Sequence, residues 1–261
     1  MIKLKSVKNK DISIDELISI IKKLRAPDGC DWDKKQTHQS LTPYLLEETY
    51  EVIEAIENND FNGLKEELGD LLLHVLFQAE LSDEKNKFNI QDSINSICQK
   101  LINRHPHIFY SKDDPRWKEG NWEESKRKEK KRESIIDGVP IALPALNKAR
   151  RIQEKASSVG FDWDNINQVI EKVDEEIEEM KYAIYNDENI DEEFGDVLFS
   201  IVNLSRHLNI NPESSLDKAI NKFSFRFKKI EKDLKKKNIK MQDLSLAELD
   251  NIWNQNKQKE K

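Results

Sequence analysis

The sequence predicts an all-α fold made of two related helical bundles. The 261 residues include 7 glycines and 7 prolines, whereas average usage would give about 18 and about 13 in a chain of this length. Apolar residues recur at helical spacing, as in the series Ile14, Leu17, Ile18 and Ile21. No segment alternates with a period of two for long enough to predict a strand. So few breakers favour long helices over a turn-rich β architecture.

Four helix starts can be predicted from capping patterns. In chain order they are Ser13 with Glu16, Thr42 before Pro43, Asn211 before Pro212, and Ser245 with Glu248. The first and last have the spacing of a capping box, and the middle two combine an N-cap with a first-turn proline. We therefore expect helices from residue 14, through residues 47–56, from residue 212 toward Lys235, and near the C-terminus.

The chain repeats itself once. GCDWD at 29–33 recurs as GFDWD at 160–164, EETYE at 47–51 as EEIEE at 175–179, and ELGD at 67–70 as EFGD at 193–196. Because the same motifs occur twice in the same order, the sequence predicts two copies of one helical unit.

A basic run, SKRKEKKRES at 125–134, lies between the copies and is followed by Gly138, Pro140 and Pro144. A charge run followed by breakers indicates a boundary. We expect an N-terminal helical domain at 1–124, a charged linker at 125–138 and a C-terminal helical domain at 139–261. Interleaved glutamates dilute the charge, so we interpret the run as a solvated linker.

Composition excludes several classes of protein. No stretch approaches the roughly 20 apolar residues that a membrane-spanning helix needs, and charges interrupt any apolar core at the N-terminus, so we expect a cytoplasmic protein without a membrane partner. The formal net charge of -7 argues against nucleic acid as a partner. Cys30 and Cys98 form no CxxC pair and carry no functional signal.

Four carboxylates of the second copy are expected to converge. Glu176 and Glu179 lie three residues apart, as do Glu193 and Asp196, so each pair projects from one face of its helix. A turn through residues 186–189 would let the two helices lie antiparallel. The first copy offers the same pattern in a second candidate set, Glu48, Glu51, Glu67 and Asp70.

A helical wheel of the segment that starts at Glu193 shows a narrow polar stripe. Asp196, Ser200, Asn203 and His207 fall beside Glu193, and apolar residues occupy most of the remaining circumference. Such a helix is typical of a bundle interior, so we expect its stripe to line an interior cleft.

Converging carboxylates repel one another and lose hydration, so a cation is expected among them. Ligation by oxygen alone favours a hard ion, Mg²⁺, with Mn²⁺ as the alternative. Lys222 and Arg226, four residues apart, can present two cations to phosphate oxygens. Trp253 either stacks on a base or packs in the core. Together these groups favour phosphoryl chemistry on a nucleotide.

Several long blocks of the sequence carry a family resemblance. They are LRAPDGCDWDKKQTHQSLTPYLLEETYEVIEAI, KEELGDLLLHVLFQAEL, RHPHIF, VPIALPALNKARRIQEKASSVGFDWD and EEFGDVLFSIVNLSRHL. With EExxE followed by ExxD, they resemble the MazG nucleoside triphosphate pyrophosphohydrolases, which are all-α enzymes, over nearly the whole chain.

The resemblance implies hydrolysis of nucleoside triphosphates, ATP included, between the α and β phosphates, with release of pyrophosphate. It also implies Mg²⁺ dependence and a homodimer. Carried over by position, the metal ligands are Glu176, Glu179, Glu193 and Asp196. The implied nucleotide contacts are Lys172, Glu175, Glu176, Glu192, Asp196, Lys222, Arg226 and Trp253. The proton acceptor is expected to be Glu175 or one of the ligands, which completes the candidate catalytic set.

The two copies need not be equally active. His74 and Phe77 stand where the second copy has Ser200 and Asn203, so we expect the C-terminal copy to carry most of the hydrolysis and the N-terminal copy to be weaker, regulatory or structural. The alternative is a nucleotide-sensing or dimerisation module that binds the metal–nucleotide complex without turnover. A di-iron bundle is disfavoured because no histidine has Glu three positions before it.

Overall fold

The computed structural model of the chain describes residues 12–117 and 133–258, and all regular structure within these two ranges is helical. The predicted all-α class is therefore confirmed. The chain divides into two compact units, residues 1–120 and 121–261. Most of the expected linker at 125–138 lies outside the described residues, so the domain boundaries remain a prediction. Among the described helices, none combines the length and the apolar character that crossing a membrane requires.

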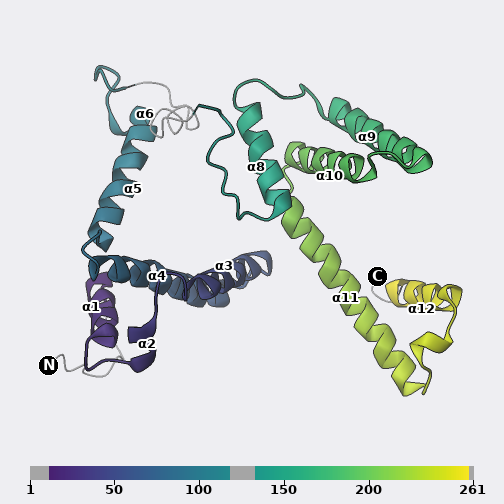
Figure 1. Cartoon of the computed structure of the whole chain (residues 1–261), viewed down its shortest axis with the longest axis horizontal. Coiled ribbons are helices and arrows are strands. Elements are labelled where there is room, and N and C mark those ends of the chain that lie inside the picture. Colours follow the sequence, from purple (N-terminus) through teal and green to yellow (C-terminus); the bar gives the residue numbers. More distant parts are fainter. Residues whose placement is uncertain (1–11, 118–132, 259–261) are drawn as a thin grey trace. The chain divides into compact units, whose positions relative to one another are not determined.

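The first unit is built around a pair of long helices (Figure 1). Its elements are α1 (Ile14–Arg25), α2 (Asp31–Lys35), α3 (Thr42–Glu57), α4 (Phe61–Asp83), α5 (Ile90–Arg104) and α6 (Pro106–Phe109). Helix α3 packs along α4, and α1 and α5 also contact α4. The core is a cluster of buried side chains, Ile21, Leu41, Leu76, Phe77 and Leu81.

Local sequence explains where the first helices begin. Ser13 and Glu16 form the predicted capping box, because each side chain accepts a hydrogen bond from the other's backbone N–H. The prediction of Thr42 as an N-cap is wrong: Leu41 holds that position, and the Thr42 hydroxyl donates to the carbonyl of His38. The threonine lies one residue too late to cap, inside the first turn.

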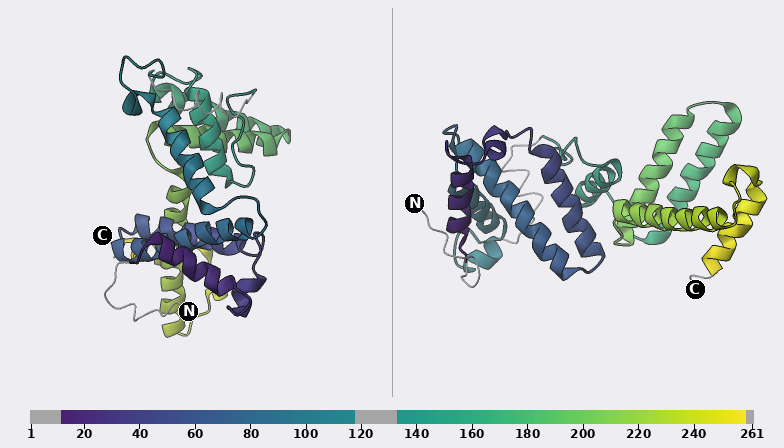
Figure 2. Two further views of the ribbon diagram at one scale, coloured as in Figure 1. Left: turned by 90° about the vertical axis from the view of Figure 1, so that its left-hand side faces the viewer. Right: turned by 90° about the horizontal axis from the view of Figure 1, so that it is seen from below.

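The second unit contains the other copy of the pattern. Its elements are α8 (Ala145–Ser157), α9 (Ile166–Asn186), α10 (Ile190–His207), α11 (Pro212–Lys236), the 3₁₀ helix η1 (Met241–Asp243) and α12 (Leu246–Gln258). Helices α9 and α10 form a hairpin, α8 packs on α10, and α11 contacts α8 and α12 (Figures 1 and 2). Asn211 caps α11 as predicted, and Ser245 exchanges hydrogen bonds with Glu248 at the start of α12.

The turn between α9 and α10 is short because two residues adopt the left-handed conformation. Asp187 has φ of 56° and Asn189 has φ of 52°, a conformation that Asn and Asp tolerate better than most side chains. This confirms the predicted reversal at residues 186–189. It makes the two helices antiparallel neighbours.

Helix α10 buries the middle of its polar stripe and leaves part of its apolar surface open. Ser200 and Asn203 are 7% and 5% exposed, whereas Glu193 and His207 are half-buried and Asp196 is exposed. The prediction that the stripe faces inward is therefore confirmed for Ser200 and Asn203 only. The prediction that the surrounding apolar side chains are buried in the same bundle is wrong for the single chain, since Phe194 and Leu198 are 54% and 42% exposed. The rest of the second unit also covers the apolar side chains of Val197 and Val202, which are 8% and 1% exposed, but it leaves Phe194 and Leu198 open.

Candidate metal and nucleotide site

Three carboxylates of the second unit converge across the α9–α10 hairpin. Glu176 on α9 and Glu193 and Asp196 on α10 each offer an oxygen, and these oxygens all lie within 4.8 Å of one another. Glu179 lies one turn further along α9 and is exposed. The structure does not bring Glu179 into this group, although its charge acts on Glu193.

Glu176 is the buried member of the group, at 7% exposure. Its Oε1 accepts a salt bridge of 2.7 Å from Nζ of Lys172, which also lies 3.0 Å from Oε1 of Glu175. These two carboxylates raise the pKa of Lys172. Oε2 of Glu176 is buried and has no hydrogen-bond partner within the described part of the chain. A buried carboxylate oxygen without a partner is costly, and a cation placed there would remove that cost.

The electrostatics of Glu193 agree with this interpretation. Loss of hydration and the neighbouring carboxylates of Glu179, Asp196 and Glu176 raise its pKa. A nearby positive charge would stabilise the ionised form of this carboxylate. Because the donors are carboxylate oxygens, the residues present fit a hard divalent cation.

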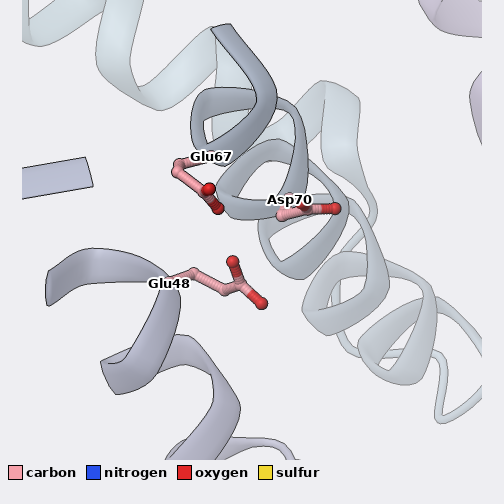
Figure 3. Close-up of side chains that lie close together, drawn as sticks. All are labelled: Glu48, Glu67 and Asp70. Atoms are coloured by element: carbon pink, nitrogen blue, oxygen red, sulfur yellow. The ribbon is translucent and has the colours of Figure 1, made fainter. Parts of the chain in front are cut away.

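The first unit repeats the acidic group. Glu48 on α3 and Glu67 and Asp70 on α4 have ligand oxygens within 4.8 Å of one another, and Figure 3 shows the three side chains facing a common space between the two helices. Loss of hydration, followed by the charges of neighbouring carboxylates that include Glu51 and Asp70, raises the pKa of both Glu48 and Glu67. Both candidate metal sets of the sequence therefore assemble in part.

A cavity of about 300 Å³ adjoins the second acidic group, at the lower end of the range for small-molecule sites. Glu176, Asp196 and Lys172 line one part of it. Helix α8, the loop at 161–163 and the later turns of α10 complete the wall. The sequence predicted a cleft along the polar stripe of α10, and Asp196, Ser200 and Asn203 of that stripe line this cavity. The walls formed by α8 and by the GFDWD motif were not predicted.

A polar network holds the far part of the cavity wall. The carboxylate of Asp162 accepts hydrogen bonds from both terminal nitrogens of Arg206, one of them at 2.8 Å, and Arg206 Nε donates to Oδ1 of Asn203 at 3.0 Å. This guanidinium keeps the pKa of Asp162 well below its usual range. Sequence analysis missed Asp162 and Arg206, whose signals were the second DWD motif and a basic residue next to the polar stripe.

The remaining predicted nucleotide contacts lie elsewhere in the second unit. Lys222 and Arg226 are on α11, and the Arg226 guanidinium carbon lies 5.7 Å from the ring centroid of Trp253 on α12. Trp253 also packs on Phe223, with ring centroids 5.1 Å apart. None of these side chains lines the cavity. Glu192 is exposed in the first turn of α10.

Comparisons with known proteins identify the family of the chain. A family model described as the MazG nucleotide pyrophosphohydrolase domain matches residues 36–109 and 164–230, one segment in each copy of the repeat. The chain is 49% identical over 249 residues to the nucleoside triphosphate pyrophosphohydrolase/pyrophosphatase MazG of Thermotoga maritima, covering 95% of this chain and 96% of that protein. It is 41% identical over 257 residues to the nucleoside triphosphate pyrophosphohydrolase of Escherichia coli, covering 95% and 98%. It is also similar, at 43% identity, to YabN of Bacillus subtilis, covering 93% of this chain and 51% of that protein.

Proposed function

The chain belongs to the MazG nucleotide pyrophosphohydrolase family, and we propose that it hydrolyses nucleoside triphosphates to monophosphates and pyrophosphate at the acidic group of its second unit. The observation that carries this proposal is the convergence of Glu176, Glu193 and Asp196 beside a cavity large enough for a ligand. The orphaned Oε2 of Glu176 supports a cation at this point. We assign Mg²⁺ to it, with Mn²⁺ as the alternative, and Glu179 as a further ligand.

Bound Mg²⁺ would offset the charge of the phosphates and polarise the phosphorus that is attacked. The residues of the chain have separate tasks around it. Lys172 is paired with Glu176 and Glu175, and we assign its ammonium group to a phosphate oxygen of the triphosphate. Glu175 is exposed and paired with Lys172, and we assign to it the acceptance of the proton of an attacking water molecule.

Lys222, Arg226 and Trp253 remain proposed contacts of the nucleotide, together with Glu192. The two cations suit the distal phosphates, since Arg presents a planar fork and Lys a point charge. Replacing Arg226 by Lys should raise the KM for the triphosphate more than it lowers kcat, because its role is binding.

We propose that the second unit carries most of the activity, as predicted from the sequence. The first unit retains three converging carboxylates, but Phe77 is buried in its core at the position that corresponds to Asn203. This difference favours a weaker activity, or a regulatory or structural role, for the first unit.

A homodimer is also part of the proposal. Phe194, Leu198 and Ile201 of α10 are 54%, 42% and 44% exposed, and a contiguous apolar face of this kind favours burial against another surface. The expected cytoplasmic location stays part of the proposal because nucleoside triphosphates are cytoplasmic metabolites. Light scattering during size-exclusion chromatography should give twice the mass of the 30.7 kDa chain for the wild type, and Leu198→Glu should reduce it. A monomeric wild type would contradict the dimer.

The test of the function is release of pyrophosphate from a panel of nucleoside triphosphates, with Mg²⁺ and after its removal by a chelator. Turnover should require the metal, and Glu193→Gln should lose at least about 10²-fold, as expected when a group that stabilises the transition state is removed. Retained activity in Glu193→Gln would contradict the assigned site. Binding of metal and nucleotide by the wild type without any pyrophosphate would favour the sensing module instead.

A further inference from the structure

We propose that the lysine face of α11 binds the phosphate backbone of a single-stranded nucleic acid, and that Phe225 in the middle of this face stacks on a base. The lysine face consists of Phe225 and the seven lysines of the helix, Lys218, Lys222, Lys228, Lys229, Lys232, Lys235 and Lys236. The inference does not depend on the proposed hydrolysis, because the acidic group takes no part in it.

The charge of the chain is unevenly distributed. Residues 212–240 carry ten basic and four acidic side chains, a net charge of +6, within a chain whose net charge is -7. The total charge argues against a nucleic acid partner, but a basic stripe along one helix is itself the electrostatic footprint of such a partner. The local charge therefore favours a polyanion at α11.

The geometry of the helix gathers the lysines on one side. At about 100° per residue, all seven lie within about 80° of Phe225 around the helix axis. Six of them are exposed and Lys229 is half-buried. Asp217 and Asp233 lie at the two edges of this arc, and Asp233 lies 3.7 Å from Lys236. The positive charges thus form one continuous face that carboxylates only border.

Most of the lysine face is available to an external anion. Within the described ranges, no ion pair or hydrogen bond engages the side chains of Lys222, Lys228, Lys232 and Lys235. The face extends over the eighteen residues from 218 to 236, about 27 Å at 1.5 Å per residue. A stacked strand carries one phosphate per about 3.4 Å, so about eight phosphates would lie along this length.

The position of Phe225 favours nucleic acid over a membrane surface. A helix that lies in a membrane interface buries its apolar face in lipid. The apolar face of α11 is on the opposite side from Phe225 and is partly covered: Ile230 and Leu234 are 3% and 4% exposed, and Phe223 packs on Trp253 of α12. Phe225 is instead 63% exposed among the lysines. An exposed aromatic ring in a positively charged surface is typical of proteins that bind single strands by stacking on their bases.

The first experiment measures binding of labelled oligonucleotides to the full-length protein by fluorescence anisotropy. Oligouridylate and oligothymidylate of equal length share the phosphate chemistry, and comparing them distinguishes RNA from DNA as the source. EDTA is present, so that Mg²⁺ bound at the acidic group does not contribute. If four phosphates are neutralised, the Kd should rise about 50-fold between about 50 and about 200 mM salt.

A triple variant tests whether the lysine face is responsible. Lys228→Gln, Lys232→Gln and Lys235→Gln together remove three exposed charges and leave Lys222, a proposed contact of the triphosphate, in place. The slope of log Kd against log salt should fall by about two, and the Kd at the lowest salt should rise at least about tenfold. Pyrophosphate release should stay at the wild-type value. If the triple variant does not fold, the three single variants decide, each with a slope lower by about 0.7.

The matched control removes the same number of charges from the first unit. Lys85, Lys87 and Lys112 are exposed there, and their joint replacement by Gln should leave both the Kd and the salt slope unchanged. An equal loss of binding in the two triple variants would overturn the inference, because total charge would then control binding. Absence of salt-dependent binding of both oligonucleotides by the wild type would overturn it too. So would sedimentation with phosphatidylserine vesicles by a protein that binds neither oligonucleotide.

The second experiment separates stacking from charge. Phe225→Ala removes the ring and no charge, so the Kd of the oligonucleotides should rise at least about fivefold, as expected for a lost stacking contact, while the salt slope stays unchanged. Phe88→Ala is the matched control, since Phe88 is 45% exposed in the first unit, and it should bind like the wild type. An unchanged Kd in Phe225→Ala overturns the role of Phe225.

Discussion

Replacing Glu176 by Gln should separate the stability of the metal-free protein from its response to Mg²⁺. Glu176 is the buried carboxylate of the acidic group, with one oxygen on Lys172 and the other without a partner. Glutamine keeps the shape and removes the charge. Without Mg²⁺ the melting temperature of the variant should change little, because the loss of the ion pair with Lys172 opposes the relief of repulsion among the carboxylates.

The size of the Mg²⁺ response follows from ligand linkage. At a free Mg²⁺ concentration 100 times the Kd, binding stabilises the folded state by about 2.7 kcal/mol. For a unit of roughly 150 residues this corresponds to a rise of about 5–10 °C in the melting temperature. The variant lacks the charged ligand, so its rise should be close to zero and its pyrophosphate release should fall about 10²-fold or more.

The assay is thermal unfolding followed by circular dichroism, with and without Mg²⁺, on the full-length protein. Glu178→Gln is the matched control, since Glu178 lies on the same helix, is exposed and pairs with Lys181. A Mg²⁺-dependent rise in Glu176→Gln as large as that in the control would refute the assignment of Glu176 to the metal.

Three further perturbations test neighbouring parts of the second unit. Lys172→Met frees Glu176 from its ion pair, so calorimetry should show tighter binding of Mg²⁺ alone. The KM for the triphosphate should rise by about tenfold or more, as expected for a lost charge-assisted hydrogen bond. If Mg²⁺ and the triphosphate both bound more weakly, or both more tightly, Lys172 would not have the two roles of pairing with Glu176 and contacting a phosphate. Asp162→Asn should lower the free energy of unfolding in denaturant titrations above pH 3.8, the ordinary pKa of Asp. The difference in stability between the wild type and the variant should vanish as the pH falls, because Arg206 lowers the pKa of Asp162 only in the folded state. A difference in stability that does not depend on pH would refute this. Gly160→Ala should destabilise the unit by about 1–2 kcal/mol, because Gly160 has φ of 87° and a side chain is strained there; an unchanged unfolding midpoint would contradict that reasoning.

Much of the fold could be predicted from the sequence because its signals are local. The capping box at Ser13 and the cap at Asn211 depend on residues within one turn, and both form as predicted. The turn at residues 186–189 was equally local. Thr42 was wrongly predicted as the N-cap of α3. A threonine before a proline can be either the N-cap or a residue of the first turn, and in the structure Leu41 is the N-cap.

The candidate site was predictable where one helix hairpin determines it. Glu176, Glu193 and Asp196 converge because their spacing places them on facing helix surfaces. A cleft along the polar stripe of α10 was predicted, but its other walls were not, because they depend on how the side chains of α8 and the loop at 161–163 pack over α10. That packing brings Gln153 to within 2.8 Å of the carbonyl of Phe199, 46 residues later in the chain, a distance in sequence over which periodicity carries no information.

The short reversal between α9 and α10 has a consequence for the history of the molecule. Because three residues separate the two helices of the hairpin, the converging carboxylates of the second unit are all encoded between positions 176 and 196, and those of the first between 48 and 70. Duplication of such a short continuous segment copies all of the converging carboxylates together, even if the residues that surround them change later. Each copy could thus retain its carboxylates while the surrounding residues diverged. The first unit now has a filled core at this place, and the second has a cavity.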